Sequence, residues 1–327
     1  MKVAVTGAAG HLGAALLHEL CNREIQVKGL FRDADIRSSK NLPVEIVYGD
    51  MLHPGVLLSL FKNCDMVIHC AAIISINGDP TGIVHQTNVT GTQLAINAAL
   101  ECGIKRFIHI SSIHAFQQKP TFKILDEQRS PVTDKAFAYD RSKLEGQQVA
   151  LAANNRGMQV LVLHPTSIIG PYDFKPSLMG NVIIDLFKGK LPFIFKGGFD
   201  FCDCRDVANT ITNSLTMGTA GETYLLSGEW YSLQQLAKFI SVASSKKINP
   251  IALPLFAAKA GLPFVKLIAA IKHTEPLYSI EAVEALFNGN RCISSAKAVS
   301  DLKYTIRPFA QTVYDTFYWF NNNGYLD

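Results

Sequence analysis

A doubly wound α/β fold, in which helices cover both faces of a parallel sheet, is predicted by three features of the sequence. Short apolar segments alternate with longer amphipathic ones up to about residue 165. The connections between them are short, as in successive βαβ units. A glycine-rich turn at 7–13 joins the first apolar segment to the first amphipathic one. These features favour a sheet that binds ligands at the carboxyl ends of its strands.

The elements of the first half follow from their apolar periodicity. The predicted strands are short and mostly apolar, and cover residues 2–5, 26–31, 44–49, 65–72, 106–112 and 159–165. In the first predicted helix, Leu12, Leu16 and Leu20 recur at a spacing of four. The predicted helices cover residues 10–21, 54–62, 81–102 and 138–155, and residues 113–136 are predicted to be irregular.

Beyond residue 165 the alternation weakens, because proline and glycine become frequent and longer helical segments dominate. Helices are expected at 177–188, 231–245, 254–271, 279–288 and 307–323. One or two strands near 192–227 are expected to return to the main sheet. The sequence therefore predicts a smaller, mostly helical substrate-binding domain over 171–327, interleaved with the first domain.

The composition argues against binding to nucleic acid and against a membrane span. The net charge is +4, and no run of five like charges occurs. The most apolar stretch, 251–271, contains two prolines and two lysines, and a lysine is costly to bury in lipid. We expect this stretch to form helices that pack over a substrate pocket. The N-terminus lacks the pattern of a signal peptide.

The cysteines and histidines do not have the spacing of metal ligands. Of seven cysteines, only Cys202 and Cys204 form a close pair, and no second pair accompanies them. No metal site is predicted. We expect reduced thiols in a cytoplasmic protein.

Three glycines follow the first predicted strand and open the first predicted helix. Gly7, Gly10 and Gly13 permit a tight turn and the close approach of a pyrophosphate, whose charge suits the helix N-terminus. The alternative is a purely structural turn. The position between strand and helix indicates a dinucleotide site. Residues 1–170 are therefore predicted to form an NAD(P)-binding Rossmann-type domain.

The residue that ends the second predicted strand favours NADP over NAD. An acidic residue there would bind the ribose 2′-hydroxyl of NAD, whereas Arg32 suits a 2′-phosphate. Arg37 and Lys40 add positive charge, although Asp33 follows directly. Surface salt bridges are the alternative explanation for these basic residues.

A tyrosine and a lysine four residues apart lie where the ligand-binding edge of the sheet is expected. Tyr139 and Lys143 share a face of the helix that follows the strand at 106–112. An ammonium and an oxidised nicotinamide both stabilise phenolate, so Tyr139 could exchange a proton with an alcohol or carbonyl. A serine at the end of the strand, Ser111 or Ser112, could hold the substrate oxygen. Strand-end capping is the alternative role for either serine.

The ordered set of motifs resembles the extended short-chain dehydrogenase/reductases of the NAD-dependent epimerase/dehydratase superfamily. "TGAAGHLG" matches TGxxGxxG, "YDRSK" matches YxxxK, and "NVTGT" matches the N-V-x-G-T helix of that family. The resemblance implies four catalytic residues: Tyr139, Lys143, Ser112 (rather than Ser111) and Asn88. It also implies coenzyme contacts from Gly7, Gly10, His11, Leu12, Gly13, Arg32, Asp50, Met51, Cys70, Ala71, Ala72, Tyr139, Lys143, Pro165 and Ile168.

Within that family, "LFRD" and "CDCRDVA" look most like the dihydroflavonol-4-reductase-like branch. The resemblance implies an NADP-dependent reductase of a ketone or aldehyde, or the reverse reaction on a secondary alcohol. A nucleotide-sugar epimerase or dehydratase with tightly bound NAD is an alternative, although His164 stands where many such enzymes carry arginine. A non-catalytic NADP-sensing protein is the second alternative. Relatives that dimerise through a helix bundle make a homodimer a further expectation.

The substrate pocket is expected to be lined by residues 73–78, 113–120 and 173–180 and by helices after residue 250. Four aromatic residues fall in or near these segments: Phe116, Tyr172, Phe174 and Phe193. An apolar or aromatic substrate is one interpretation, and packing in the core is the other.

Overall fold

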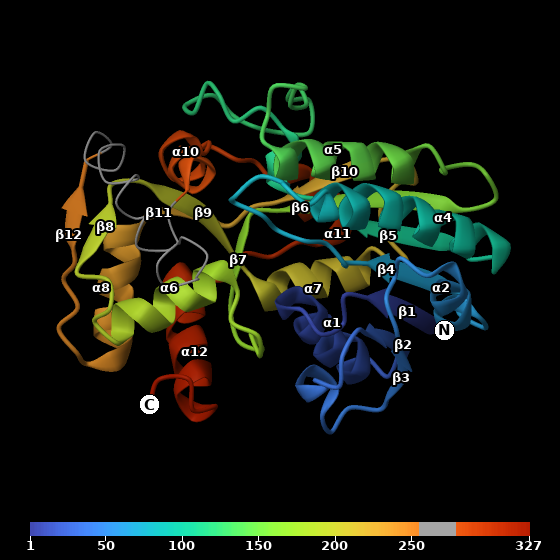
Figure 1. The fold of residues 1–327 in the computed structure, drawn as a ribbon, viewed down its shortest axis with the longest axis horizontal. Coiled ribbons are helices and arrows are strands. Elements are labelled where there is room, and N and C mark those ends of the chain that lie inside the picture. Colours follow the sequence, from blue (N-terminus) through green and yellow to red (C-terminus); the bar gives the residue numbers. More distant parts are fainter. Residues whose placement is uncertain (255–278) are drawn as a thin grey trace.

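The computed structural model, drawn in Figure 1, describes residues 1–254 and 279–327. Its central sheet has seven parallel strands. Across the sheet the order is β10 (Thr223–Leu226), β6 (Gln159–Pro165), β5 (Arg106–Ile110), β4 (Met66–His69), β1 (Lys2–Thr6), β2 (Gln26–Phe31) and β3 (Val44–Tyr48). Every neighbouring pair is parallel. The predicted doubly wound α/β fold is therefore confirmed. The strands predicted at 65–72 and 106–112 end earlier, at His69 and Ile110.

Helices cover both faces of this sheet because its strands are apolar on both sides. In β1, Val3 and Val5 belong to one hydrophobic cluster, whereas Ala4 belongs to another. The first cluster contains residues of α1 (His11–Asn22), α7 (Cys204–Asn213) and α11 (Ala296–Leu302). The second contains residues of α2 (Pro54–Phe61), α4 (Gly91–Glu101) and α5 (Ala138–Leu151).

The helix predicted at 81–102 is one continuous helical run with a π-helical segment inside it. It consists of α3 (Ile83–His85), the π-helical residues Gln86–Thr90, and α4. A Cβ at Gly146 of α5 would lie 2.6 Å from the carbonyl oxygen of Asn88. The absence of a side chain at Gly146 therefore lets α5 pack closely against the widened turn.

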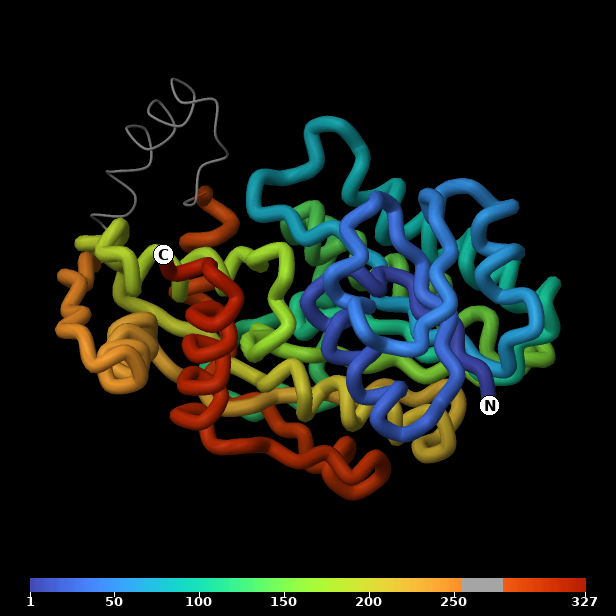
Figure 2. The backbone as a smooth tube through the Cα atoms, turned by 90° about the horizontal axis from the view of Figure 1, so that it is seen from below, coloured from blue at the N-terminus to red at the C-terminus, as the bar shows by residue number. Residues whose placement is uncertain are grey.

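The C-terminal part of the chain builds a second core beside the main sheet, on the left of Figure 2. One small sheet has the order β11 (Glu229–Ser232), β9 (Gly198–Asp203), β7 (Ser167–Ile169), and another pairs β12 (Ile251–Leu253) with β8 (Phe193–Phe195). A third hydrophobic cluster joins β8 and β9 to the helices α6 (Leu178–Phe187), α8 (Leu233–Ser244), α10 (Ile280–Asn288) and α12 (Phe309–Asn322). This core holds the segments expected to contact substrate beside the main sheet.

The predictions for the second half have mixed outcomes. One or two strands are expected to return to the main sheet from 192–227, and one does so, since β10 joins it while β8 and β9 belong to the small sheets. The helix predicted from residue 231 begins at Leu233, because Ser232 first pairs with Gly198 and then caps α8 through a reciprocal bond with Gln235. The helix predicted at 254–271 lies almost wholly outside the described residues.

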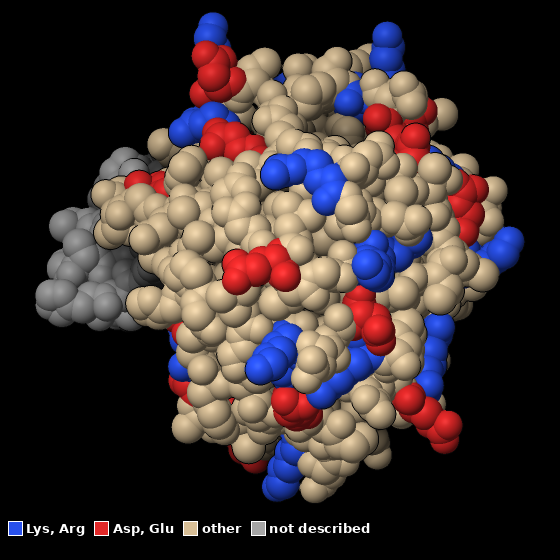
Figure 3. Space-filling model, turned by 90° about the vertical axis from the view of Figure 1, so that its right-hand side faces the viewer, with Lys and Arg blue, Asp and Glu red and all other residues tan. Residues whose placement is uncertain are grey.

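Figure 3 shows the right-hand side of the molecule as drawn in Figure 1, and charges of both signs are interspersed on this face. Among residues 1–254 and 279–327, no helix combines the length and the apolar character needed to span a bilayer. Within the same ranges, no group of three His, Cys, Asp or Glu residues is placed to hold a metal ion.

Candidate active site

The glycine turn joins β1 to α1 at the carboxyl edge of the main sheet. Gly7 has a φ of 72°, and a Cβ there would lie 2.7 Å from the backbone nitrogen of Ala71. Gly10 is the N-cap of α1, which has neither a side-chain cap nor an acidic residue in its first turn. The first N–H groups of α1 therefore lack side-chain partners and can bind the pyrophosphate of a dinucleotide.

Gly13→Ala is expected to disrupt this turn. A Cβ at Gly13 would overlap the carbonyl oxygen of Gly7 and lie 2.9 Å from the Cα of Ala8, so backbone would have to move. Overpacking costs about 1–3 kcal/mol, so the affinity for NADPH should fall about tenfold or more in a fluorescence titration. Gly55→Ala is the matched control, because a Cβ there meets nothing within 4 Å. Equal affinities in the two variants would contradict this account.

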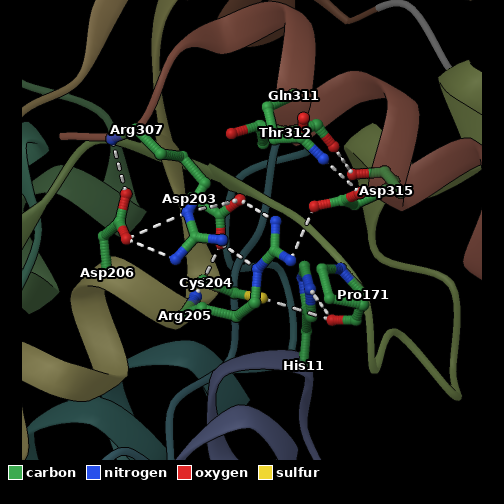
Figure 4. Close-up of polar contacts among 11 residues, drawn as sticks. His11, Pro171, Asp203, Cys204, Arg205, Asp206, Arg307, Gln311, Thr312 and Asp315 are labelled. Atoms are coloured by element: carbon green, nitrogen blue, oxygen red, sulfur yellow. Dashed lines mark hydrogen bonds and ion pairs between the residues drawn. The ribbon is translucent and has the colours of Figure 1, made fainter.

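Two residues inside the glycine turn have side chains that contact protein. The imidazole of His11 lies 3.0 Å from the carbonyl oxygen of Pro171 (Figure 4). It also lies 4.0 Å from the carboxylate of Asp173. Leu12 packs against the first hydrophobic cluster. Both residues therefore present their backbone, rather than their side chains, to the expected pyrophosphate position.

The loop after β4 lies against the glycine turn. The backbone N–H of Ala71 donates to the hydroxyl of Thr6 at 3.3 Å, while Cys70 and Ala72 flank it with partly exposed side chains. Burial raises the pKa of the Cys70 thiol to about 12, so this cysteine stays protonated. The structure therefore brings Cys70, Ala71 and Ala72 to the predicted dinucleotide site.

Other predicted coenzyme residues have mixed placements. Asp50 accepts a hydrogen bond from the backbone of Leu52 at 2.9 Å. The side chain of Met51 is 7% exposed and belongs to the second hydrophobic cluster. Pro165 ends β6 in a buried position, and Ile168 of β7 packs against the first cluster. The side chains of Met51 and Ile168 therefore contribute to hydrophobic packing.

Arg32 directly follows β2 and is exposed. Its guanidinium makes no hydrogen bond or ion pair with any residue that the structure describes. The neighbouring Asp33 pairs with Lys175 through both carboxylate oxygens, at 2.9 and 3.1 Å. Arg37 is held by Asp35 instead, at 2.7 and 2.8 Å. Of the two arginines, Arg32 is therefore the one whose guanidinium is free to bind an anion.

Ser112, Tyr139 and Lys143 converge beyond the end of β5. Tyr139 and Lys143 lie in the first half of α5, and Ser112 begins the short 3₁₀ turn Ile113–Ala115. The Ser112 hydroxyl interacts with the Tyr139 phenol and lowers its pKa. The ammonium of Lys143 donates to the carbonyl oxygen of Ile110 at 2.8 Å. The structure thus brings together three of the four residues predicted to be catalytic.

Burial governs the acidity of both titratable groups. Burial, with a smaller contribution from the carboxylate of Asp140, raises the pKa of the Tyr139 phenol to about 12 against the lowering effect of the Ser112 hydroxyl. Burial also lowers the pKa of the Lys143 ammonium to about 8, against a raising effect of Cys70. At neutral pH, Tyr139 is therefore a phenol that can donate its proton. The ammonium of Lys143, whose pKa is lowered, lies on the same face of the helix.

Asn88, the fourth predicted residue, lies in the π-helical segment and is 3% exposed. Its amide nitrogen donates to the carbonyl oxygen of Ile73 at 3.0 Å and to the hydroxyl of Ser142 at 2.9 Å. Its amide oxygen accepts the N–H of Ile73 at 2.8 Å. Ser142 in turn donates to the backbone carbonyl of Tyr139 at 2.7 Å. Asn88 is therefore connected to the backbone of Tyr139 through Ser142.

The structure separates the two serines that end β5. Ser111 donates to the side-chain oxygen of Gln147 at 2.9 Å, and the same oxygen lies 2.7 Å from the imidazole of His164. Ser112 instead faces Tyr139. This arrangement favours Ser112 as the residue that orients substrate, and gives Ser111 a role in packing.

The sequence assigns no individual role to two residues beside Tyr139. The imidazole of His114 packs edge-on to the Tyr139 ring, with centroids 5.8 Å apart. Its Nδ1 lies 2.9 Å from a carboxylate oxygen of Asp140. His114 falls in the segment 113–120 expected to line the pocket, and Asp140 occupies an unspecified position of "YDRSK", so neither gave a signal specific to that residue.

A network of ion pairs joins the two parts of the molecule behind the glycine turn (Figure 4). Arg205 of α7 binds Asp203, the N-cap of that helix, and reaches Asp315 of α12 at 2.7 Å. Arg307 binds Asp206 at 2.7 Å. Because α7 packs against α1, the network fixes the C-terminal helices relative to the glycine turn.

The aromatic residues proposed to line the pocket pack mainly against protein. Phe116 contacts His164 edge-on in a small core cluster. Tyr172 stacks on His18 at 4.2 Å, and Phe174 packs on Trp319. Phe193 is 52% exposed on β8. For the first three, packing explains the aromatic residue.

Comparisons with known proteins agree with this geometry. The model of the family described as "NAD dependent epimerase/dehydratase family" matches residues 3–227. A putative dihydroflavonol 4-reductase of Synechocystis sp. is 30% identical over 332 residues, covering 98% of this chain and 95% of that protein. Sterol demethylase protein B of Methylococcus capsulatus is 29% identical over 255 residues, 78% of each chain. The solved structure of gox2253 superimposes with a TM-score of 0.84 at 26% identity, covering 100% of this chain and 99% of its own.

Proposed function

Because the chain belongs to the NAD-dependent epimerase/dehydratase family of extended short-chain dehydrogenase/reductases, we propose that it is an NADP-dependent reductase of ketones or aldehydes. The reverse reaction would oxidise a secondary alcohol. The observation that carries the proposal is the meeting of Ser112, Tyr139 and Lys143 at the sheet edge that also holds the glycine turn. In this proposal residues 1–170 hold the coenzyme and 171–327 supply most of the substrate contacts.

The chemistry follows from the three side chains. The nicotinamide supplies or accepts the hydride when the coenzyme is bound. Ser112 donates a hydrogen bond that orients the substrate oxygen, and Tyr139 gives that oxygen its proton. Lys143 lies on the same helix face and stabilises the phenolate that forms. In alcohol oxidation the same groups act in reverse, with the Tyr139 phenolate as the base.

The preference for NADP rests on charges at the end of β2. Arg32 is exposed and unpaired within the described part of the chain, so its guanidinium can bind a 2′-phosphate in bidentate fashion. Asp33, which would repel that phosphate, is neutralised by Lys175. This pairing removes the main objection that the sequence raises against NADP.

Arg32→Ala is expected to lower kcat/KM for NADPH by about tenfold to a hundredfold, the value of a charge-assisted hydrogen-bonded pair. The kcat/KM for NADH should change little, because NADH has no 2′-phosphate. Arg37→Ala is the matched control, since that guanidinium is already held by Asp35. A wild-type enzyme that prefers NADH, or equal losses with both coenzymes, would count against the assignment.

The substrate class is proposed from the relatives. Their names point to a dihydroflavonol and to a sterol, both bulky and largely apolar, so we propose an apolar carbonyl compound. A panel of flavanone, steroid and aromatic carbonyls, tested with NADPH and NADH, examines this directly. Analysis of co-purified nucleotide belongs in the same experiment. Stoichiometric NAD retained by the protein, with no net turnover of carbonyls, would favour a nucleotide-sugar epimerase or dehydratase instead.

We also propose a cytoplasmic location, which suits the seven free cysteines of the chain. A homodimer remains part of the proposal through family resemblance alone. Size-exclusion chromatography with light scattering measures the oligomeric state.

A further inference from the structure

His114 and Asp140 link the two segments that carry the catalytic hydroxyls. Ser112 follows β5, whereas Tyr139 begins α5, so the two residues reach each other only through the fold. His114 stands two residues after Ser112, and Asp140 directly follows Tyr139. The His114 Nδ1 lies 2.9 Å from the Asp140 carboxylate, and the side chains are 33% and 19% exposed. One largely buried contact therefore ties the neighbours of Ser112 to the neighbours of Tyr139.

His114 touches the catalytic pair in two further ways. Its backbone N–H donates to the hydroxyl oxygen of Ser112 at 3.2 Å, so the proton of that hydroxyl stays available for the Tyr139 oxygen. Its imidazole packs against the Tyr139 ring at an interplanar angle of 64°. The residue therefore constrains both members of the pair.

We propose that His114 and Asp140 are a positioning pair, which holds Ser112 against Tyr139 and tunes the acidity of the Tyr139 phenol. This inference deepens the proposed function and rests on it. Neither His114 nor Asp140 touches the reacting atoms. The pair acts through the distance between the two hydroxyls and through the charge beside the phenol.

The electrostatic part of the proposal depends on the groups around Tyr139. The Asp140 carboxylate raises the pKa of the phenol. Glu281 of α10 interacts with Asp140 and with the backbone of Gly78, which adds a second acid at this edge. Four other titratable residues interact with the ammonium of Lys143: Cys70, His69, His109 and His164.

Asp140→Asn separates charge from hydrogen bonding, because the amide oxygen can still accept from His114. Removal of the charge should lower the pKa of Tyr139, because a carboxylate beside the phenol disfavours the phenolate. In carbonyl reduction, the alkaline limb of the kcat/KM profile should move to lower pH, because the phenol is lost earlier. In alcohol oxidation, the acid limb should also move to lower pH, because the phenolate forms earlier.

His114→Ala tests the positioning part. The kcat should fall about tenfold while the KM for NADPH is unchanged, because the two hydroxyls lose their alignment. His114→Asn should recover most of the loss, since its amide nitrogen can take the place of Nδ1. The matched control is the other histidine–acid pair on α5, His85 and Glu145 at 3.1 Å. His85→Ala and Glu145→Gln should leave kcat and both pH profiles as in the wild type.

The outcomes of these experiments distinguish a failure of the positioning pair from a failure of the proposed function. Wild-type pH profiles and kcat in both Asp140→Asn and His114→Ala would overturn the inference, even if their melting temperatures fall. An inactive wild-type protein, or a fully active Tyr139→Phe variant, would instead refute the proposed function. In that case, ultraviolet titration of tyrosinate, with Tyr139→Phe as the difference reference, still decides the coupling. An unchanged Tyr139 pKa in Asp140→Asn would then overturn the inference on its own.

Discussion

Tyr139→Phe should reduce turnover by about 10²–10⁴-fold, the usual contribution of a positioned general acid. The substitution removes one oxygen and keeps the ring that packs against His114. The affinity for NADPH should therefore remain close to that of the wild type. Stopped-flow NADPH oxidation measures the first quantity and a fluorescence titration measures the second, with the best carbonyl from the substrate panel.

The matched control is Tyr304→Phe, which also removes a buried phenol oxygen. The Tyr304 hydroxyl donates to the carbonyl oxygen of Ser227 at 2.9 Å, far along the chain from the catalytic pair. Its loss should cost about 1 kcal/mol of stability and little turnover. If Tyr139→Phe behaved like Tyr304→Phe, Tyr139 would not be the general acid.

The main sheet was predictable from the sequence because each of its strands is a local signal. A continuous apolar segment such as β1, followed by a glycine turn and a helix with leucines at a spacing of four, needs no knowledge of distant residues. The C-terminal part lacks such signals. Strands β7, β8 and β12 have three residues each, and their partners lie tens of residues away. Such strands become recognisable only when the fold brings their partners together.

The catalytic residues divide in the same way. Tyr139 and Lys143 share a helix face at a fixed spacing, so the sequence alone pairs them. The pairing of His114 with Asp140 spans 26 residues and depends on how β5 and α5 meet. The sequence left two interpretations open for the aromatic residues, pocket lining and core packing, because a sequence segment does not reveal the direction of its side chains. Tyr172 lies in the expected segment but stacks on His18 of α1.

Three histidines form a buried layer beneath Lys143, on neighbouring parallel strands. His69 of β4 pairs in register with His109 of β5, and their rings stack at 5.6 Å. His164 of β6 bonds to Gln147 of α5. Each is at most 2% exposed. Burial lowers the pKa of His69 and of His164 to about 3, that of His109 falls well below its usual range, and the charge of Lys143 adds to each shift.

These histidines are expected to make the protein unstable in mild acid. They stay neutral in the folded state, whereas in the unfolded chain they bind protons below about pH 6.5. The unfolded state therefore gains protons first, so the stability present above pH 6.5 is lost as the pH falls toward 3. Each histidine removes about 1.4 kcal/mol per pH unit, and typical domains have only about 5–15 kcal/mol to lose. Urea unfolding between about pH 7 and pH 5 measures the slope.

His109→Leu tests which groups cause this slope. Both ring nitrogens of His109 are buried without a hydrogen-bond partner among the described residues, so the substitution sacrifices no such bond. Stability at neutral pH should be unchanged or higher, and the slope should fall by about 1.4 kcal/mol per pH unit. The exposed His53 serves as the control, because its side chain does not cap α2 and His53→Ala should leave the slope intact. A wild-type slope in His109→Leu would show that this imidazole does titrate in the folded protein, and the buried layer would no longer account for acid unfolding.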